Sequence, residues 1–302
     1  MPVEPPIETP ATLAEAFGIL AGSTADAPIV PIAGGTDVMV RITGEIGEPP
    51  ERMIDLSRLE ALRGISADDG HVVLGALTTY TDIRRSDLCR EHLPTLVAAA
   101  ATIGAAQIQN RGTIGGNIAN ASPAGDTLPV LLALSASIDV GGPRGERTVG
   151  ADDVWIAYRR TALAPDELIL RVRIPLAGGR ESRFRKVGTR RAQAISKVVM
   201  ALSWRETGRD QVVSGPAGRR AAGPVWEDVR LALGSVADRP IRARTTEAVL
   251  TGAAPTAATA DRAAETLAAE IAPIDDVRSS ADYRRVVAAR VLHRMIRDAG
   301  GW

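Results

Sequence analysis

The most distinctive stretch of the chain reads RGTIGGNIANASPAGDTLP at residues 111–129, and a shorter glycine-rich loop reads AGGTD at residues 33–37. Glycine admits positive φ and lets a backbone approach a ligand without a Cβ in the way, and successive N–H groups in that geometry can surround an anion. Two such loops in one chain predict a long ligand whose central diphosphate is held from both sides. For either glycine pair alone, an ordinary tight turn is the alternative.

Neither loop has the spacing of the common nucleotide-binding motifs. The dinucleotide fingerprint G-x-G-x-x-G does not occur, and neither does the phosphate loop G-x-x-x-x-G-K-[ST]. These absences argue against a Rossmann domain and against a P-loop nucleotide hydrolase. The sequence therefore predicts a diphosphate-binding domain of another kind.

Length and charge narrow the class of protein further. The 302 residues suggest about two domains. The 36 basic and 36 acidic side chains cancel, which gives no electrostatic reason to expect nucleic acid or an anionic membrane as a partner. The apolar run at residues 128–134 is too short to cross a bilayer, and residues 1–6 lack the layout of a signal peptide. We therefore expect a cytoplasmic protein.

The chain has few residues that could ligate a metal. Cys89 is the only cysteine, whereas an iron–sulfur cluster needs about four. His71, His92 and His293 are scattered and do not have the spacing of a zinc site. We expect Cys89 to be a packed thiol and the chain to hold no metal of its own.

Helix caps and apolar patterns predict an α+β fold. Thr12 and Glu15 form a capping box before a helix with one apolar face. Residues 281–298 have an apolar face at helical spacing, with Ser279 as the expected N-cap, and residues 128–134 are apolar all round, as in a buried helix. Strands are predicted at residues 29–32, 53–56, 71–76, 137–140, 167–175, 184–188, 198–204 and 229–233.

With these motifs the chain resembles the FAD-binding medium subunits of molybdenum hydroxylases, the family of xanthine dehydrogenase and aerobic carbon monoxide dehydrogenase. The resemblance covers nearly the whole length and includes both glycine loops, the strand end at residues 186–191 and the tail at residues 276–284. It implies an α+β architecture with an FAD-binding domain of the PCMH type, made of two α/β subdomains, over residues 1–177. A smaller α+β domain of the carbon monoxide dehydrogenase flavoprotein C-terminal type follows at residues 178–302, after a linker at residues 177–179.

The resemblance also implies which residues bind FAD, without a covalent bond. Thr36 would lie near the flavin ring, and Asp126 would accept a hydrogen bond from a sugar hydroxyl. Lys186 would favour the anionic reduced flavin, although a surface lysine at a strand end is the alternative for it. Ile103 stands where the family has a phenylalanine, so only a backbone contact is expected there. The full set of implied FAD-binding residues is Pro31, Ile32, Ala33, Gly34, Gly35, Thr36, Asp37, Val38, Ile103, Thr113, Ile114, Gly115, Gly116, Asn117, Asp126, Ile169 and Lys186.

The implied function is electron transfer. A large partner subunit would oxidise the substrate at a molybdenum cofactor, and a small partner would pass electrons through [2Fe-2S] clusters to FAD and on to NAD⁺ or another acceptor, in a dimer of heterotrimers. No acid, base or nucleophile of this chain is required. The alternatives are a flavin-free scaffold subunit and a stand-alone FAD-dependent oxidase of the vanillyl-alcohol oxidase type. The substrate, whether purine, carbon monoxide, N-heterocycle or aldehyde, would bind in another polypeptide.

Overall fold

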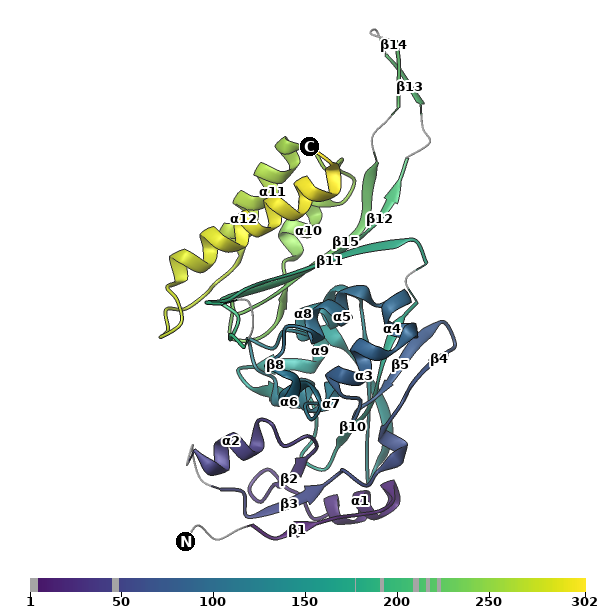
Figure 1. Ribbon diagram of the computed structural model, residues 1–302, viewed down its shortest axis with the longest axis vertical. Coiled ribbons are helices and arrows are strands. Elements are labelled where there is room, and N and C mark those ends of the chain that lie inside the picture. Colours follow the sequence, from purple (N-terminus) through teal and green to yellow (C-terminus); the bar gives the residue numbers. More distant parts are fainter. Residues whose placement is uncertain are drawn as a thin grey trace. The chain divides into compact units, whose positions relative to one another are not determined.

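The computed structural model describes residues 5–44, 49–176, 178–190, 193–208, 212–215, 218–221 and 224–302. It is a mixed fold of helices and strands (Figure 1), as the sequence predicts. The described residues form two compact units. The first takes the chain up to Ser122 together with Ser135–Leu176, and the second takes Pro123–Leu134 together with the chain from residue 178 on. Two predicted positions, Ala177 of the linker and Arg191 of the strand end, lie outside the described residues.

The first unit contains two sheets. A parallel sheet has the strand order β1-β3-β2, and an antiparallel sheet has the order β4-β5-β10-β6-β7. The strands are β1 (Ile7–Glu8), β2 (Ile29–Ile32), β3 (Arg52–Asp55), β4 (Ile65–Asp68), β5 (His71–Gly75), β6 (Ser137–Gly142), β7 (Gly145–Gly150) and β10 (Leu168–Pro175). A small hairpin of β8 (Trp155–Ala157) and β9 (Arg160–Thr161) completes the strands described in this unit.

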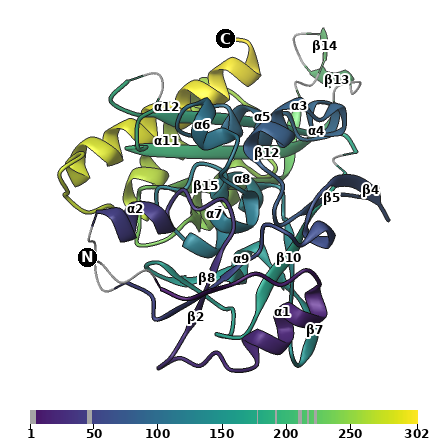
Figure 2. The same cartoon turned by 60° about the horizontal axis from the view of Figure 1, so that its bottom comes forward.

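The first helix, α1 (Leu13–Leu20), begins after the predicted N-cap Thr12, but the second hydrogen bond of the predicted capping box goes to the residue before Thr12. The Thr12 side chain accepts a hydrogen bond from the N–H of Glu15, and the Glu15 carboxylate accepts one from the N–H of Ala11. Ala16 and Leu20 are buried in a cluster that includes Leu168 of β10, and Figure 2 shows α1 beside this strand. Burial of one apolar face therefore holds α1 against the antiparallel sheet.

The first unit contains further short helices, and α7 begins within the second glycine loop. They are η1 (Glu60–Leu62), α2 (Val38–Thr43), α3 (Tyr80–Arg85), α4 (Asp87–His92), α5 (Pro94–Ala100), α6 (Ala106–Gln109), α7 (Ile114–Asn120) and α9 (Ala151–Val154). Cys89 on α4 is buried, and its burial raises the pKa of the thiol, so the expectation of a packed thiol is confirmed.

The second unit is an antiparallel sheet with helices on it. The sheet has the order β11-β12-β15-β16, and Figure 1 shows α10, α11 and α12 covering one of its faces. The elements are α8 (Leu128–Ala133), β11 (Arg180–Val187), β12 (Val198–Thr207), β15 (Val225–Gly234), β16 (Ile241–Arg242), α10 (Arg244–Leu250), α11 (Ala257–Glu270) and α12 (Ala281–Gly300), with the ribbon β13 (Val212–Gly215) and β14 (Gly218–Ala221).

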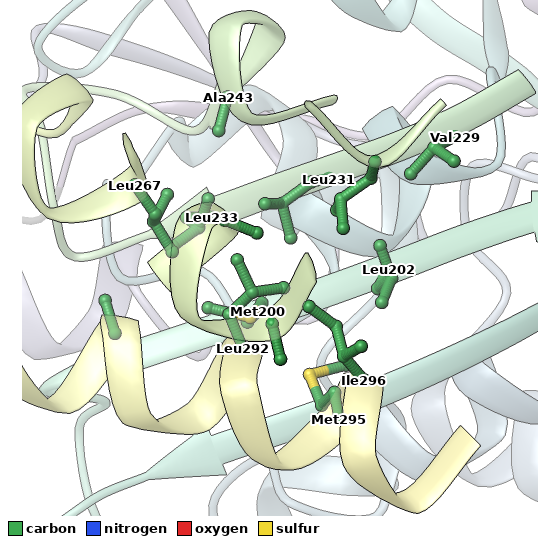
Figure 3. Packing of buried hydrophobic residues seen from close by; sticks show 14 of the residues in the cluster. Met200, Leu202, Val229, Leu231, Leu233, Ala243, Leu267, Leu292, Met295 and Ile296 are labelled. Atoms are coloured by element: carbon green, nitrogen blue, oxygen red, sulfur yellow. The ribbon is translucent and has the colours of Figure 1, made fainter. Parts of the chain in front are cut away.

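Strand alternation decides what each face of this sheet contacts. Met200 and Leu202 of β12 point toward Leu292 and Met295 of α12 (Figure 3). Ser203, the next residue of β12, points to the opposite face and donates a 2.6 Å hydrogen bond to the carbonyl of Ala133 at the end of α8. The predicted helix at 128–134 is therefore confirmed as a buried helix, since every residue of α8 is buried.

The N-cap of the last helix differs from the predicted one. The side chain of Ser280, not Ser279, accepts a hydrogen bond from the N–H of Tyr283. The N–H of Ser279 instead donates to Asp276, which ties this residue into the preceding turn. In the part of the chain that the structure describes, no helix combines the length and the apolar character needed to span a membrane.

Replacing a core leucine of α12 tests this packing. We expect Leu292→Ala to lower the free energy of unfolding by about 2–5 kcal/mol, because it removes buried methyl groups and leaves a cavity. The matched variant Val286→Ala, on the same helix at a side chain that is 48% exposed, is expected to change it by no more than about 0.5 kcal/mol. Urea unfolding followed by tryptophan fluorescence measures both, since Trp204 and Trp226 stack within the same core. Equal losses in the two variants would contradict this packing.

Candidate cofactor site

The first unit contains a cavity of about 320 Å³ that both glycine loops line. Most of the predicted FAD-binding residues of this unit form its wall: Pro31, Ala33, Gly34, Gly35, Thr36, Asp37, Val38, Thr113, Gly115, Gly116, Asn117 and Ile169. Residues outside the prediction complete it: Val30, Arg41, Leu56, Ala76, Leu77, Tyr80, Ala119, Asn120, Arg159, Leu163, Glu167 and Leu168.

The first glycine loop connects β2 to α2 and presents free donors. Gly35 has φ +75°, a conformation that glycine adopts without strain. Among the hydrogen bonds of the described residues, none is donated by the backbone N–H groups of Gly34, Gly35 or Thr36. Three successive N–H groups beside a left-handed residue form the kind of concavity that binds anions. The first loop therefore has the donors that a diphosphate needs.

The second glycine loop is built differently, and here one expectation is wrong. The N–H groups of Ile114 and Gly115 donate to the carbonyls of Thr78 and Ala76, at 3.0 and 2.9 Å. The N–H of Gly116 donates to the Thr113 hydroxyl at 3.1 Å. These donors at the start of α7 are satisfied within the protein, so they do not line up against a ligand as the glycine pattern suggests.

Packing explains the glycine at position 115. A Cβ there would lie 2.7 Å from the carbonyl oxygen of Ala76, closer than real Cβ atoms approach. The loop before α3 and the first turn of α7 are thus in direct backbone contact. This glycine permits a close approach of two protein segments, and the second loop contributes to the cavity as a wall.

The other predicted residues are not among those that line this cavity of the first unit. Ile32 is half-buried at the end of β2, and Ile114 is buried within α7. The carbonyl of Ile103 accepts a 2.9 Å hydrogen bond from the Gln109 side chain. Asp126 and Lys186 belong to the second unit. Whether each of the seventeen predicted residues contacts FAD stays a prediction.

Within the second unit, Asp126 and Lys186 form an ion pair. The Lys186 Nζ lies 2.5 Å from Asp126 Oδ2, and both side chains are about nine-tenths buried. Each charge is therefore neutralised where water is largely excluded, and removal of one partner would leave the other charge uncompensated. The pair joins β11 to the segment before α8.

Two hydrogen bonds hold the segment before Asp126, and a third connects the two serines that make them. The N–H of Ser235 donates to the carbonyl of Pro123 at 2.7 Å, and the Ser196 hydroxyl donates to the carbonyl of Ala124 at 3.1 Å. The Ser235 hydroxyl in turn donates to the carbonyl of Ser196 at 2.9 Å. Ser196 and Ser235 are both buried, so this arrangement fixes the backbone that leads to Asp126.

The tail at residues 276–284 supports this arrangement. The buried Arg284 guanidinium donates to the carbonyl of Ser235 at 2.9 Å and to the Asp276 carboxylate at 2.6 Å. Burial alone would raise the pKa of Asp276, but hydrogen bonds from the N–H groups of Arg278 and Ser279 and from Arg284 hold it below its ordinary value. Asp276 is thus kept charged to orient Arg284.

One acidic residue of the cavity wall is neutralised by a partner. Glu167 accepts two hydrogen bonds from Arg147, at 2.7 and 2.8 Å, and one from the N–H of Ala164 at 2.8 Å. The Arg147 hydrogen bond is the main reason that the pKa of Glu167 lies below its ordinary value. The carboxylate is therefore charged at neutral pH and does not repel an anion as an isolated carboxylate would.

Comparison with known proteins identifies the family. The model of the FAD binding domain in molybdopterin dehydrogenase matches residues 3–177, and the carbon monoxide dehydrogenase flavoprotein C-terminal domain matches residues 183–299. The carbon monoxide dehydrogenase medium chain of Hydrogenophaga pseudoflava is 30% identical over 96% of this chain and 95% of its own length. The xanthine dehydrogenase FAD-binding subunit of Escherichia coli O157:H7 is 29% identical, with 96% of each chain covered.

A solved structure agrees with these matches. A chain of the Hydrogenophaga pseudoflava carbon monoxide dehydrogenase that lacks the Mo-pyranopterin moiety superimposes with a TM-score of 0.87 at 30% identity, covering 97% of this chain and 96% of that one. The chain belongs to the family of FAD-binding domains of molybdopterin dehydrogenases, and it is an oxidoreductase subunit. The resemblance and the fold class predicted from the sequence are confirmed. The residues present fit FAD, since the first loop lines the cavity with N–H groups that no described residue accepts from.

Alanine at Gly115 tests the contact between α7 and the Ala76 backbone. We expect Gly115→Ala to cost about 1–3 kcal/mol of stability, because the backbones must separate. Gly18→Ala is the control: a Cβ at this position on α1 meets nothing within 4 Å, and alanine should stabilise the helix by about 0.5–1 kcal/mol. Urea denaturation compares the two variants. An unchanged stability of Gly115→Ala would contradict the close approach.

The ion pair of Glu167 with Arg147 predicts that the free energy of unfolding depends on pH. Because its folded pKa is depressed, its contribution to stability is present above the unfolded pKa of about 4.3 and is lost as pH falls through the lower folded value. Glu167→Gln should lower the free energy of unfolding by about 1 kcal/mol at pH 7, and the difference from the wild type should shrink below about pH 4. Glu60→Gln, at a carboxylate that is 82% exposed, should show a smaller difference at pH 7. Denaturation curves between pH 3 and pH 7 measure this, and a difference that does not change with pH would count against the ion pair.

Proposed function

We propose that this chain is the FAD-carrying electron-transfer subunit of a molybdenum hydroxylase complex. It takes electrons from [2Fe-2S] clusters of a small partner subunit and passes them to NAD⁺ or another acceptor, while the substrate is oxidised at a molybdenum cofactor in a large partner subunit. The observation that carries the proposal is the cavity wall, where the loop at residues 33–37 presents free N–H groups within a domain that matches the family's FAD-binding domain.

The cysteine count supports a division of labour between chains. A single cysteine in the sequence does not supply the roughly four thiolates of an iron–sulfur cluster, so the clusters belong to a partner in this proposal. The relatives are named as a medium chain and an FAD-binding subunit, which are parts of larger enzymes. The proposed assembly is a dimer of heterotrimers.

FAD, when bound, supplies the exchange between one-electron carriers and a two-electron acceptor. The residues of this chain bind and orient it. In this proposal the N–H groups of residues 34–36 hold the diphosphate, Ile169 contributes apolar wall, and Asp126 and Lys186 remain FAD contacts that rest on the resemblance. The Lys186 charge acts on the flavin only as part of its ion pair with Asp126, so its field is weaker than that of a lone cation.

Purification of the full chain from its own cells tests the proposal. We expect a yellow protein with the absorbance of oxidised flavin and about one FAD per chain, accompanied by a molybdenum-containing large chain and a small chain with [2Fe-2S] clusters. Acid precipitation should release the FAD, because the attachment is non-covalent. Mass measurement of the complex should give two copies of each chain. Colourless protein that does not take up added FAD would favour the flavin-free scaffold instead.

A substrate screen of the purified complex distinguishes the proposed function from the second alternative, a stand-alone oxidase. The complex is assayed with NAD⁺ and with an artificial acceptor, and the substrates tested are carbon monoxide, purines, N-heterocycles and aldehydes. Oxidation should require all three chains. Substrate oxidation by this chain alone would favour a stand-alone oxidase of the vanillyl-alcohol oxidase type. We also predict reduction of NAD⁺ or another acceptor by the complex and a cytoplasmic location.

A further inference from the structure

The cavity wall contains two arginines that no glycine motif predicts. Among the wall residues the charged ones are Asp37, Arg41, Arg159 and Glu167. Arg147 neutralises Glu167, which leaves the two arginines to balance Asp37 and any bound anion. A diphosphate carries negative charge that a guanidinium binds through charge-assisted hydrogen bonds.

Two connected hydrogen bonds hold Arg159 in place. Its Nη1 donates to Asn120 Oδ1 at 2.8 Å, and Asn120 Nδ2 donates to Asp37 Oδ1 at 2.8 Å. These two hydrogen bonds thus connect the β8–β9 hairpin, through the end of α7, to the first glycine loop. The contacts of its guanidinium among the described residues are with the Asn120 amide and the Tyr158 ring, and neither is a carboxylate, so no counter-charge of the described residues neutralises it.

The backbone of Arg159 gives an independent indication. Tyr158 and Arg159 connect β8 to β9, where Ala157 pairs with Arg160, and Arg159 has φ +51°. This left-handed conformation favours glycine or asparagine over arginine. Strained positions of this kind persist where the surroundings hold them and are common at ligand sites. The hairpin therefore carries an arginine where glycine would be the better residue for the turn.

We propose that Arg159 binds the diphosphate of FAD together with the N–H groups of residues 34–36, and that Asn120 is the positioning residue that aims its guanidinium. This inference rests on the proposed function, because it takes FAD as the ligand of the cavity. The hydrogen-bonded residues Arg159, Asn120 and Asp37 then have two roles. They hold the cation on the cavity wall, and they join the first glycine loop to α7 beside the bound cofactor.

Flavin titration of the full chain tests the assignment. FAD is removed, and the dissociation constants of FAD and of riboflavin, which has no phosphate, are measured by flavin fluorescence. Arg159→Met is expected to weaken FAD binding about ten- to hundredfold, as the loss of a charge-assisted hydrogen bond does, and to change riboflavin binding less than twofold. Arg159→Lys should fall between, since it keeps the charge without the planar fork. Arg160→Met, on the same hairpin but outside the cavity wall, should change neither constant.

A second variant separates a ligand-binding role from a structural one. Arg159→Gly relieves the backbone conformation, so we expect a melting temperature equal to or above that of the wild type together with the same loss of FAD affinity. Asn120→Ala should weaken FAD binding by a smaller factor and leave riboflavin unchanged. Raising the salt concentration should weaken FAD binding more in the wild type than in Arg159→Met, because screening acts on the charge contact.

Each result is decisive. Unchanged FAD binding in Arg159→Met, or an equal loss for FAD and riboflavin, overturns the assignment while the proposed function stands. Wild-type protein that binds no FAD refutes the proposed function itself.

Discussion

The cavity depends on one contact between two backbones. A side chain on Gly34 would place its Cβ 1.8 Å from the carbonyl oxygen of Arg111, so the first glycine loop lies directly on the residue that begins the second. The Arg111 guanidinium also donates to the carbonyl of Gly34 at 3.4 Å. Any larger residue at position 34 would force the loops apart. The wall that they share exists only because this position has no side chain.

The two loops look alike in sequence, but they meet different physical demands. Gly35 gives the first loop a left-handed turn, and the successive N–H groups there have no hydrogen-bond partner among the residues that the structure describes. Gly115 instead allows α7 to touch the backbone of Ala76, and the nearby N–H groups are satisfied there. An anion would therefore be bound by the donors of the first loop, while the second loop fixes the shape of the space. Because only one loop supplies donors, a cation from another segment, such as Arg159, contributes more to the binding of an anion in this cavity.

Sequence patterns predict what is local and miss what folding brings together. The N-cap at Thr12 and the all-apolar helix at residues 128–134 are local features, and both are confirmed. The carbonyls of Ala76 and Thr78 that take the donors of α7 lie far back in the chain, so a glycine count could not reveal them. Arg159 is likewise joined to Asp37 only through tertiary contacts. The assignment of residues 123–134 to the second unit has no signal in composition or spacing.

The tail at residues 276–284 has a physical role, because it supports the backbone that leads to Asp126. Residues 276–284 are part of the family resemblance although they lie about 150 residues from Asp126 in the sequence. Asp276 orients Arg284, Arg284 holds Ser235, and the backbone of Ser235 holds Pro123. An arginine that is 4% exposed needs both partners, since an unpaired buried charge is costly. The tail therefore acts on the backbone before Asp126, since each hydrogen bond from Asp276 to Pro123 orients the group that makes the next one.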